Sequence, residues 1–293
     1  MHKKINEYEK FAVFILSHGR ADNVVTYNTL KRQNYTGKIY IVVDDEDTSI
    51  DEYKNRYRDE VIVFNKQLAI DMTDSADVLK KRNSVVYARN YAYKIAENLG
   101  LQYFLVLDDD YSTFVNVFDN RRNYITKRTA IKCLDNYFCS MIRFLENANI
   151  DCVAMSQGGD YIGGENSTIS RLHANGKMSR KAMNAFFLRV DSPLTFSGRI
   201  NEDVNMYINE GARGKIIFTY PRMRLEQIQT QSNKGGLTDI YLDVGTYVKS
   251  FYSIIYQPSC VRLMMMGAKN RRIHHKVIWK NAVPMIIGEQ YKK

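Results

Sequence analysis

Three consecutive acidic residues, Asp108, Asp109 and Asp110, follow a short apolar run at residues 103–107. The run predicts a buried strand, and open α/β sheets bind ligands where the carboxyl ends of their strands lie. Because side chains alternate along a strand, we expect Asp108 and Asp110 to address one side and Asp109 the other. Paired carboxylates suit Mg²⁺ or Mn²⁺, which keeps coordination sites for phosphate oxygens. The alternative is a solvated turn or helix cap.

A second acidic pair, Glu202 and Asp203, follows Asn201 at the start of a predicted amphipathic helix that ends near Gly211. A carboxylate in such a place can take the proton from an alcohol as the alcohol attacks carbon. Asp203 is the first candidate for this general base, and Glu202 is the second. The structural alternative is capping, because Asn is a good N-cap and acids in the first turn favour the helix dipole.

The elements that must position these acids predict an α/β fold. Apolar runs of strand length alternate with helical patterns, which favours a parallel sheet with crossover helices. The first part of the chain predicts strands at residues 11–16, 38–43, 60–64 and 103–107 and helices at 21–33 and 75–99. The rest predicts helices at 127–147, 201–211 and 241–256, strands at 152–156, 183–190 and 216–219, and a loop or hairpin at 157–180. No element is assigned to the tail.

Composition and missing motifs exclude several classes of protein. The net charge of +10 favours an anionic partner such as a nucleotide or nucleic acid. No apolar run approaches the roughly 18 residues that span a bilayer, so we expect no membrane association and a cytoplasmic location. Dehydrogenase, P-loop and zincin functions lack their motifs, G-x-G-x-x-G, G-x-x-x-x-G-K-[ST] and H-E-x-x-H. The cysteines have no paired spacing and are expected to be free thiols: Cys133, Cys139, Cys152 and Cys260.

Three separated segments resemble the GT-A nucleotide-sugar glycosyltransferases. Residues 39–51, IYIVVDDEDTSID, resemble the second strand of that fold with its terminal aspartates. Arg89, in the segment ARNYA ahead of the three aspartates, resembles the arginine-bearing helix that leads into the family's D-x-D strand. The segment NED at 201–203 resembles the motif that supplies the catalytic base. The likeness covers roughly residues 11–220 and implies a Rossmann-like, mostly parallel sheet flanked by helices.

A narrower resemblance is to the phage TET-associated glycosyltransferases. It is carried by the segment SHGR at 17–20 together with the DDD and NED segments. It implies transfer of a sugar from a UDP-sugar to the hydroxyl of a 5-hydroxymethylpyrimidine in DNA, within the host cytoplasm. It also implies a catalytic domain at 1–230, with a nucleotide-sugar half at 11–110 and an acceptor half at 111–230. Residues 231–293 would form an extension packed on the same domain.

The resemblance also implies roles for individual residues. Asp108 and Asp110 would hold Mn²⁺ or Mg²⁺ with His275 as third ligand, and the ion would stabilise the departing diphosphate. Asp44 or Asp45 would accept hydrogen bonds from uracil or ribose, unless they are ordinary turn acids. Arg20 and Arg89 would contact the diphosphate or the sugar, unless they form structural ion pairs. The full set expected to bind the donor is Ser17, Gly19, Arg20, Asp44, Asp45, Arg89, Asp108 and Asp109. Attack assisted by Asp203 would invert the anomeric carbon.

A DNA acceptor would require a basic and aromatic surface, because the target base must be reached in the major groove or extruded from the stack. The candidates for that surface are Arg121, Arg122, Tyr124, Lys127, Lys269, Arg271 and Arg272. Three alternatives stay open. They are a GT-A transferase that acts on a glycan, lipid or small molecule, a catalytically silent nucleotide or nucleic-acid binding protein, and a metal-dependent nuclease.

Overall fold

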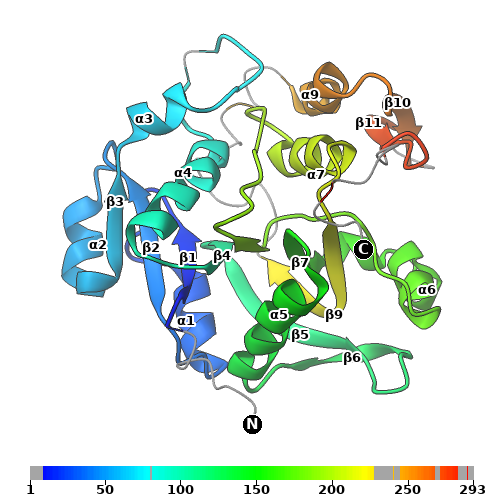
Figure 1. Cartoon of the computed structure of the whole chain (residues 1–293), viewed down its shortest axis with the longest axis horizontal. Coiled ribbons are helices and arrows are strands. Elements are labelled where there is room, and N and C mark those ends of the chain that lie inside the picture. Colours follow the sequence, from blue (N-terminus) through cyan, green and yellow to red (C-terminus); the bar gives the residue numbers. More distant parts are fainter. Residues whose placement is uncertain are drawn as a thin grey trace.

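A nine-stranded sheet runs through the centre of the molecule, with helices on both sides (Figure 1). The structure is a computed structural model that describes residues 9–79, 81–227, 240, 245–267, 271–282 and 289. The strand order is β3-β2-β1-β4-β8-β7-β9-β5-β6. Only β8 and β5 run against the other strands, so the predicted α/β fold with a mostly parallel sheet is confirmed.

The strands of this sheet agree with the apolar runs in the first half of the chain and less well in the second. Their bounds are β1 Phe11–Leu16, β2 Ile39–Asp44, β3 Val61–Phe64, β4 Tyr103–Asp108, β5 Tyr111–Phe118, β6 Tyr124–Ala130, β7 Cys152–Gln157, β8 Phe186–Arg189 and β9 Ile217–Gln227. Two further strands, β10 Val261–Met266 and β11 Arg272–Val277, form a separate antiparallel hairpin in the tail.

The helices are α1 Val25–Arg32, α2 Ile50–Tyr57, α3 Lys66–Asp71, α4 Val85–Asn98, α5 Leu134–Ala148, α6 Thr168–Ala174, α7 Glu202–Ala212 and α9 Lys249–Tyr256. Four predictions need correction. The helix predicted at 75–99 begins only at Val85, after the N-cap Ser84. The helix predicted at 127–147 begins at Leu134, because the residues before it form the edge strand β6. The stretch 157–180 contains α6, and the strand predicted at 216–219 extends to Gln227.

Alternating side chains of the central strands divide the core into two layers. Val13 and Ile15 of β1 pack in the layer that contains residues of α1, α2 and α5. Ala12 and Phe14 pack in the layer that contains residues of α3, α4 and α7. Strand β4 lies between β1 and β8 in the sheet, and its side chains pack in both layers.

The described part of the C-terminal extension shares the second core layer. Cys260, Val261 and Ala282 are buried in it, and the ring of Trp279 stacks on Tyr207 of α7 at 5.7 Å between centroids. Helix α9 also packs against α7. Of the helix predicted at 241–256, residues 241–244 lie outside the described part. The cysteines are free thiols, as predicted. Among the described residues, no helix has the length and apolar character to cross a bilayer.

Candidate active site

The three segments that follow β1, β2 and β4 lie at one edge of the sheet. These strands are adjacent and parallel in the order β2-β1-β4, so their carboxyl ends point the same way. Residues 17–20, 44–47 and 108–110 therefore come together, as the pattern of apolar runs predicts. Helix α7, with Glu202 and Asp203 in its first turn, reaches the same place through Arg89, which pairs with both Glu202 and Asp108.

Arg89 is the buried link between the aspartate run and α7. Its guanidinium lies 2.5 Å from Glu202 Oε1 and 3.2 Å from Asp108 Oδ1. The rings of Phe186 and Phe196 lie 5.1 and 5.8 Å from it, and only 1% of the residue is exposed. Burial acts to lower the pKa of Arg89, but the neighbouring carboxylates outweigh burial and raise it. Arg89 is therefore permanently charged, and its charge is engaged in ion pairs within the protein. Of the two roles considered for Arg89, the structural ion pair is the one that agrees with its position.

Glu202 and Asp203 are both buried but have different partners. Glu202 is paired with Arg89, whereas Asp203 Oδ1 accepts a hydrogen bond of 2.7 Å from the Val204 backbone N–H. Among the described residues, no cation lies within ion-pair distance of Asp203. Burial raises the pKa of both carboxyl groups, with Arg89 acting against it. Asp203 is thus the member of the pair that has no cation partner among the described residues.

Asn201 does not cap α7 with its side chain, although it stands at the N-cap position with φ of +57°. Its amide instead donates to the Lys249 carbonyl at 2.6 Å and contacts His275 Nδ1 at 3.3 Å. The capping explanation for the NED segment therefore fails for Asn201. The side chain ties α7 to the C-terminal extension.

Asp109 points away from Asp108, as strand alternation predicts. Its carboxylate accepts a hydrogen bond of 2.6 Å from Ser17 Oγ and pairs with Arg20 Nη1 at 2.6 Å. Burial raises the pKa of Asp109, while Arg20 and Ser17 act to lower it. Tyr53 OH contacts Ser17 Oγ at 2.7 Å and accepts from the Arg20 backbone N–H. Asp109 thus fixes the loop after β1 to the end of β4.

Asp110 carries the least compensated charge of the three aspartates. The amide of Gln227 in β9 donates to both of its oxygens at 3.2 Å, and no cation is paired with it among the described residues. Burial, then Asp108 and Asp109, raises the pKa of Asp110 to about 6. A divalent cation between Asp108 and Asp110 would relieve this repulsion, so these two oxygen donors fit a Mg²⁺ or Mn²⁺ ion.

His275 does not complete a metal site with these aspartates in the structure. Among the described residues, no three His, Cys, Asp or Glu side chains are grouped so that they could hold a metal ion. His275 contacts Asn201 instead, and burial together with His274, Lys249 and Lys181 lowers its pKa to about 4. The side chains that lower its pKa are basic, and none of them is a carboxylate.

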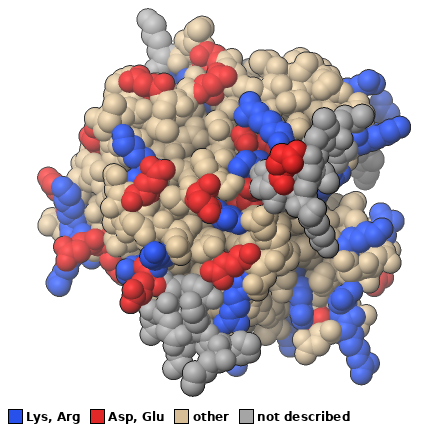
Figure 2. Space-filling view, viewed as in Figure 1, with Lys and Arg blue, Asp and Glu red and all other residues tan. Residues whose placement is uncertain are grey.

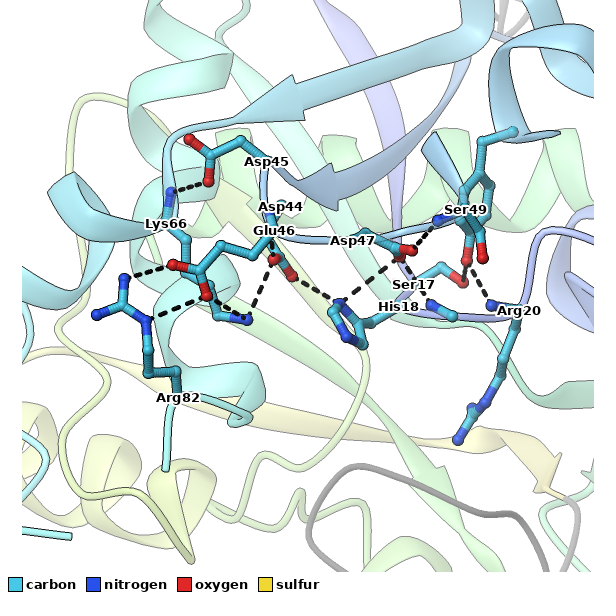
Figure 3. Close-up of polar contacts among 12 residues, drawn as sticks. Ser17, His18, Arg20, Asp44, Asp45, Glu46, Asp47, Ser49, Lys66 and Arg82 are labelled. Atoms are coloured by element: carbon cyan, nitrogen blue, oxygen red, sulfur yellow. Dashed lines mark hydrogen bonds and ion pairs between the residues drawn. The ribbon is translucent and has the colours of Figure 1, made fainter. Parts of the chain in front are cut away.

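The loop after β2 forms a second charged cluster, centred on His18 (Figure 3). His18 Nδ1 lies 2.8 Å from Asp44 and 3.6 Å from Asp47. The buried Lys66 Nζ pairs with Asp44 at 3.1 Å. The Gly19 backbone N–H donates to Asp47 at 2.7 Å, in a loop where φ of +66° favours glycine. Hydrogen bonding to Asp44 raises the pKa of His18, although burial opposes this.

Asp45 turns away from the other acids of this loop (Figure 3). It accepts hydrogen bonds from the Lys66 backbone N–H and the Asn65 amide at the start of α3. Asp44 lies in the cluster with His18, so of the two predicted donor-binding aspartates it is the better placed. The sequence does not predict the contacts of His18, Asp47 and Lys66. His18 belongs to the SHGR segment, whereas no pattern marks Lys66, because the sequence does not predict the short helix α3.

Comparison with known proteins identifies the family. The sequence matches the model of the TET-Associated Glycosyltransferase family over residues 11–236. Among curated proteins, none matches the sequence. The β10–β11 hairpin lies beyond the matched region.

Three solved structures are similar in shape. One is mannosyltransferase PcManGT from Pyrobaculum calidifontis with GDP-Man and Mn²⁺, at 11% identity and a TM-score of 0.46, covering 76% of this chain and 58% of that chain. A second is S. aureus TarS 1–349 with UDP, at 15% identity and a TM-score of 0.42, covering 73% and 60%. A third is glucosyl-3-phosphoglycerate synthase from Mycobacterium tuberculosis with Mn²⁺ and UDP, at 9% identity and a TM-score of 0.48, covering 93% and 90%.

The chain thus spans less than two thirds of the length of the first two of these structures. The family match covers most of the described chain and includes the SHGR, DDD and NED segments. The resemblance drawn from those segments is therefore confirmed at the level of the family. This chain belongs to the TET-associated glycosyltransferase family.

Proposed function

We propose that the enzyme transfers a sugar from a UDP-sugar to the hydroxyl of a 5-hydroxymethylpyrimidine in DNA, with Asp203 as general base. The observation that carries the proposal is the unequal use of the two acids at the start of α7. Glu202 is neutralised by Arg89, whereas Asp203, one residue later, is buried without a cation within ion-pair distance among the described residues. An unpaired buried carboxylate is costly and is retained where it does chemistry.

In the transfer step, Asp203 would take the proton from the acceptor hydroxyl as its oxygen attacks the anomeric carbon. The raised pKa of Asp203 brings its basicity closer to that needed near neutral pH. Attack from the face opposite the departing diphosphate gives inversion. Arg89 acts as a positioning residue, because it holds Glu202 and Asp108 on one guanidinium and so fixes the base relative to the leaving-group side.

Asp108 and Asp110 would hold the Mn²⁺ or Mg²⁺ ion. When bound, the ion would supply Lewis-acid stabilisation of the charge that grows on the departing diphosphate. Arg20 is the arginine available to assist, because its partly exposed side chain is anchored on Asp109 at the same edge of the sheet. Asp44 and His18 would contact the nucleotide, and Asp45 would support the loop that carries them.

The acceptor is inferred from the family resemblance and from the net charge of the chain, which favours a polyanion. A donor screen by mass spectrometry tests it directly. We expect UDP-sugars to modify duplexes with 5-hydroxymethylcytosine or 5-hydroxymethyluracil and to leave unmodified DNA unchanged. Asp108→Asn and Asp203→Asn should abolish the transfer, whereas Asp51→Asn, an exposed change on α2, should retain it.

Other outcomes of this screen would contradict parts of the proposal. Transfer to a glycan or small alcohol but not to DNA would indicate the wider GT-A activity. Absence of both transfer and donor hydrolysis would indicate a silent binding protein. Nicking of plain DNA with Mg²⁺ and no donor would indicate a nuclease.

A further inference from the structure

The hairpin of β10 and β11 presents an outward face on which three cations gather. Paired residues of a ladder share a face, so Arg262, Lys276, Met266 and Arg272 lie on one face together with the pair Met264 and His274. The three cations of this face are exposed. Among the described residues, none of them has a carboxylate within ion-pair distance. No acidic residue occurs in the sequence between Asp243 and Glu289.

Two of these cations are placed where they repel each other and so do not stabilise the fold. Arg262 is directly opposite Lys276 in the ladder. Like charges directly opposite each other destabilise an antiparallel pair. The next pair toward the turn is Met264 and His274, and Met264 is 37% exposed. A bound polyanion would be attracted to both cations, so this arrangement suits a surface that binds a polyanion.

The opposite face of the hairpin is attached to the start of α7. On this face Val261 is buried in the core and His275 contacts Asn201 at 3.3 Å, whereas Leu263 and Met265, nearer the turn, are 43% and 56% exposed. Asn201 directly precedes Glu202 and Asp203. In Figure 1 the hairpin lies beside α9, at the side of the molecule where α7 is found. Figure 2 shows Lys and Arg along this edge with few acids, whereas over α2 both signs are mixed.

We propose that the β10–β11 hairpin is the surface that binds the acceptor DNA duplex, with Arg262, Arg272 and Lys276 on its phosphates. This inference rests on the proposed function. A two-stranded ribbon fits the major groove, and the substituent on C5 of a pyrimidine projects into that groove. A ribbon joined to the start of α7 would therefore present the hydroxymethyl group on the side where Asp203 lies. An anionic membrane surface is the competing partner for a basic and apolar face.

The test uses the full chain and a fluorescent duplex that contains 5-hydroxymethylcytosine, without donor. The variant is Arg262→Gln/Arg272→Gln/Lys276→Gln. Its matched control is Lys54→Gln/Lys94→Gln/Lys132→Gln, which removes the same charge from exposed positions elsewhere. Loss of three phosphate contacts should flatten the slope of log affinity against log salt by about 2.7, so between 50 and 200 mM salt the unchanged protein should lose roughly 40-fold more affinity than the hairpin variant.

The hairpin variant should keep UDP-sugar hydrolysis, which shows that the donor site is intact. An unchanged salt slope in the hairpin variant, or an equal change in the control, would overturn the hairpin assignment while leaving the proposed function standing. Absence of DNA binding by the unchanged protein would instead count against the DNA acceptor. If the hairpin variant loses binding only to vesicles with anionic lipid, the surface is a membrane contact and the proposal is wrong.

Discussion

The two charged clusters at the carboxyl edge of the sheet are balanced differently. Around Asp44, the cations His18 and Lys66 lie within ion-pair distance, and Arg82 pairs with the adjacent Glu46 at 2.6 Å. Around the aspartate run and α7, five carboxylates share the two arginines Arg20 and Arg89 in the described structure. A balanced cluster holds a loop in place, whereas a cluster with excess negative charge is prepared to receive a cation and a proton.

Replacement of Arg89 should have the largest effect of the substitutions considered, because Arg89 is shared by two carboxylates of the cluster with excess negative charge. Arg89→Met leaves the carboxylates of Asp108 and Glu202 facing each other without a cation, and breaking a buried pair in this way costs about 3–5 kcal/mol. Urea unfolding at pH 7 measures the loss. Addition of Glu202→Gln to this variant should restore part of the stability. A loss below about 1 kcal/mol in the single variant would show that the cluster tolerates its charge without Arg89.

Asp203→Asn separates chemistry from stability. We expect the transfer rate to fall about 10²–10⁴-fold, the range for loss of a general base, with the melting temperature unchanged or slightly higher. The burial-raised pKa of Asp203 also predicts that the rate of the unchanged enzyme declines on acidification at a higher pH than for an ordinary aspartate base. If Glu202→Gln removes the rate while Asp203→Asn retains it, the assignment of the base is reversed.

Lys66→Met tests the balanced cluster. Lys66 is buried and pairs with Asp44, but His18 remains as a second partner, so we expect a loss of about 1–2 kcal/mol in unfolding free energy. Donor affinity should fall as well, because Asp44 would no longer be held in place. Isothermal titration with UDP measures that affinity. Retained affinity for UDP would show that Asp44 does not contact the nucleotide.

His18→Asn should have the smallest effect and should depend on pH. The raised pKa of His18 means that its charged contact with Asp44 is fully present below about pH 6.5 and is lost as pH rises through the folded-state pKa. His18 is half exposed, so the contribution is about 0.5–1 kcal/mol. Thermal melts should show a deficit at pH 5.5 that shrinks at pH 8.5. A deficit equal at both pH values would exclude the charge as its cause.

The sequence predicted the acids of the site better than their partners. Strands such as β1, β2 and β4 are continuous apolar runs that end in polar residues, so both the strands and the acids at their ends were found. Edge strand β6 is largely exposed and carries no such run, so the pattern predicts helix over its second half. The partners Lys66 and Tyr111 contact Asp44 and Asp108 because of folding, and no spacing in the sequence announces those contacts.

The stacking of Trp279 on Tyr207 has a practical consequence for anyone who trims this enzyme. A fragment cut at residue 236, where the family likeness stops, would lack Trp279, Val261 and Cys260. Helix α7 would then expose the ring of Tyr207 and the apolar side chains around it to water, and exposed apolar patches cause aggregation. We expect the shortened enzyme to precipitate on expression even though Asp108, Asp110 and Asp203 are all retained.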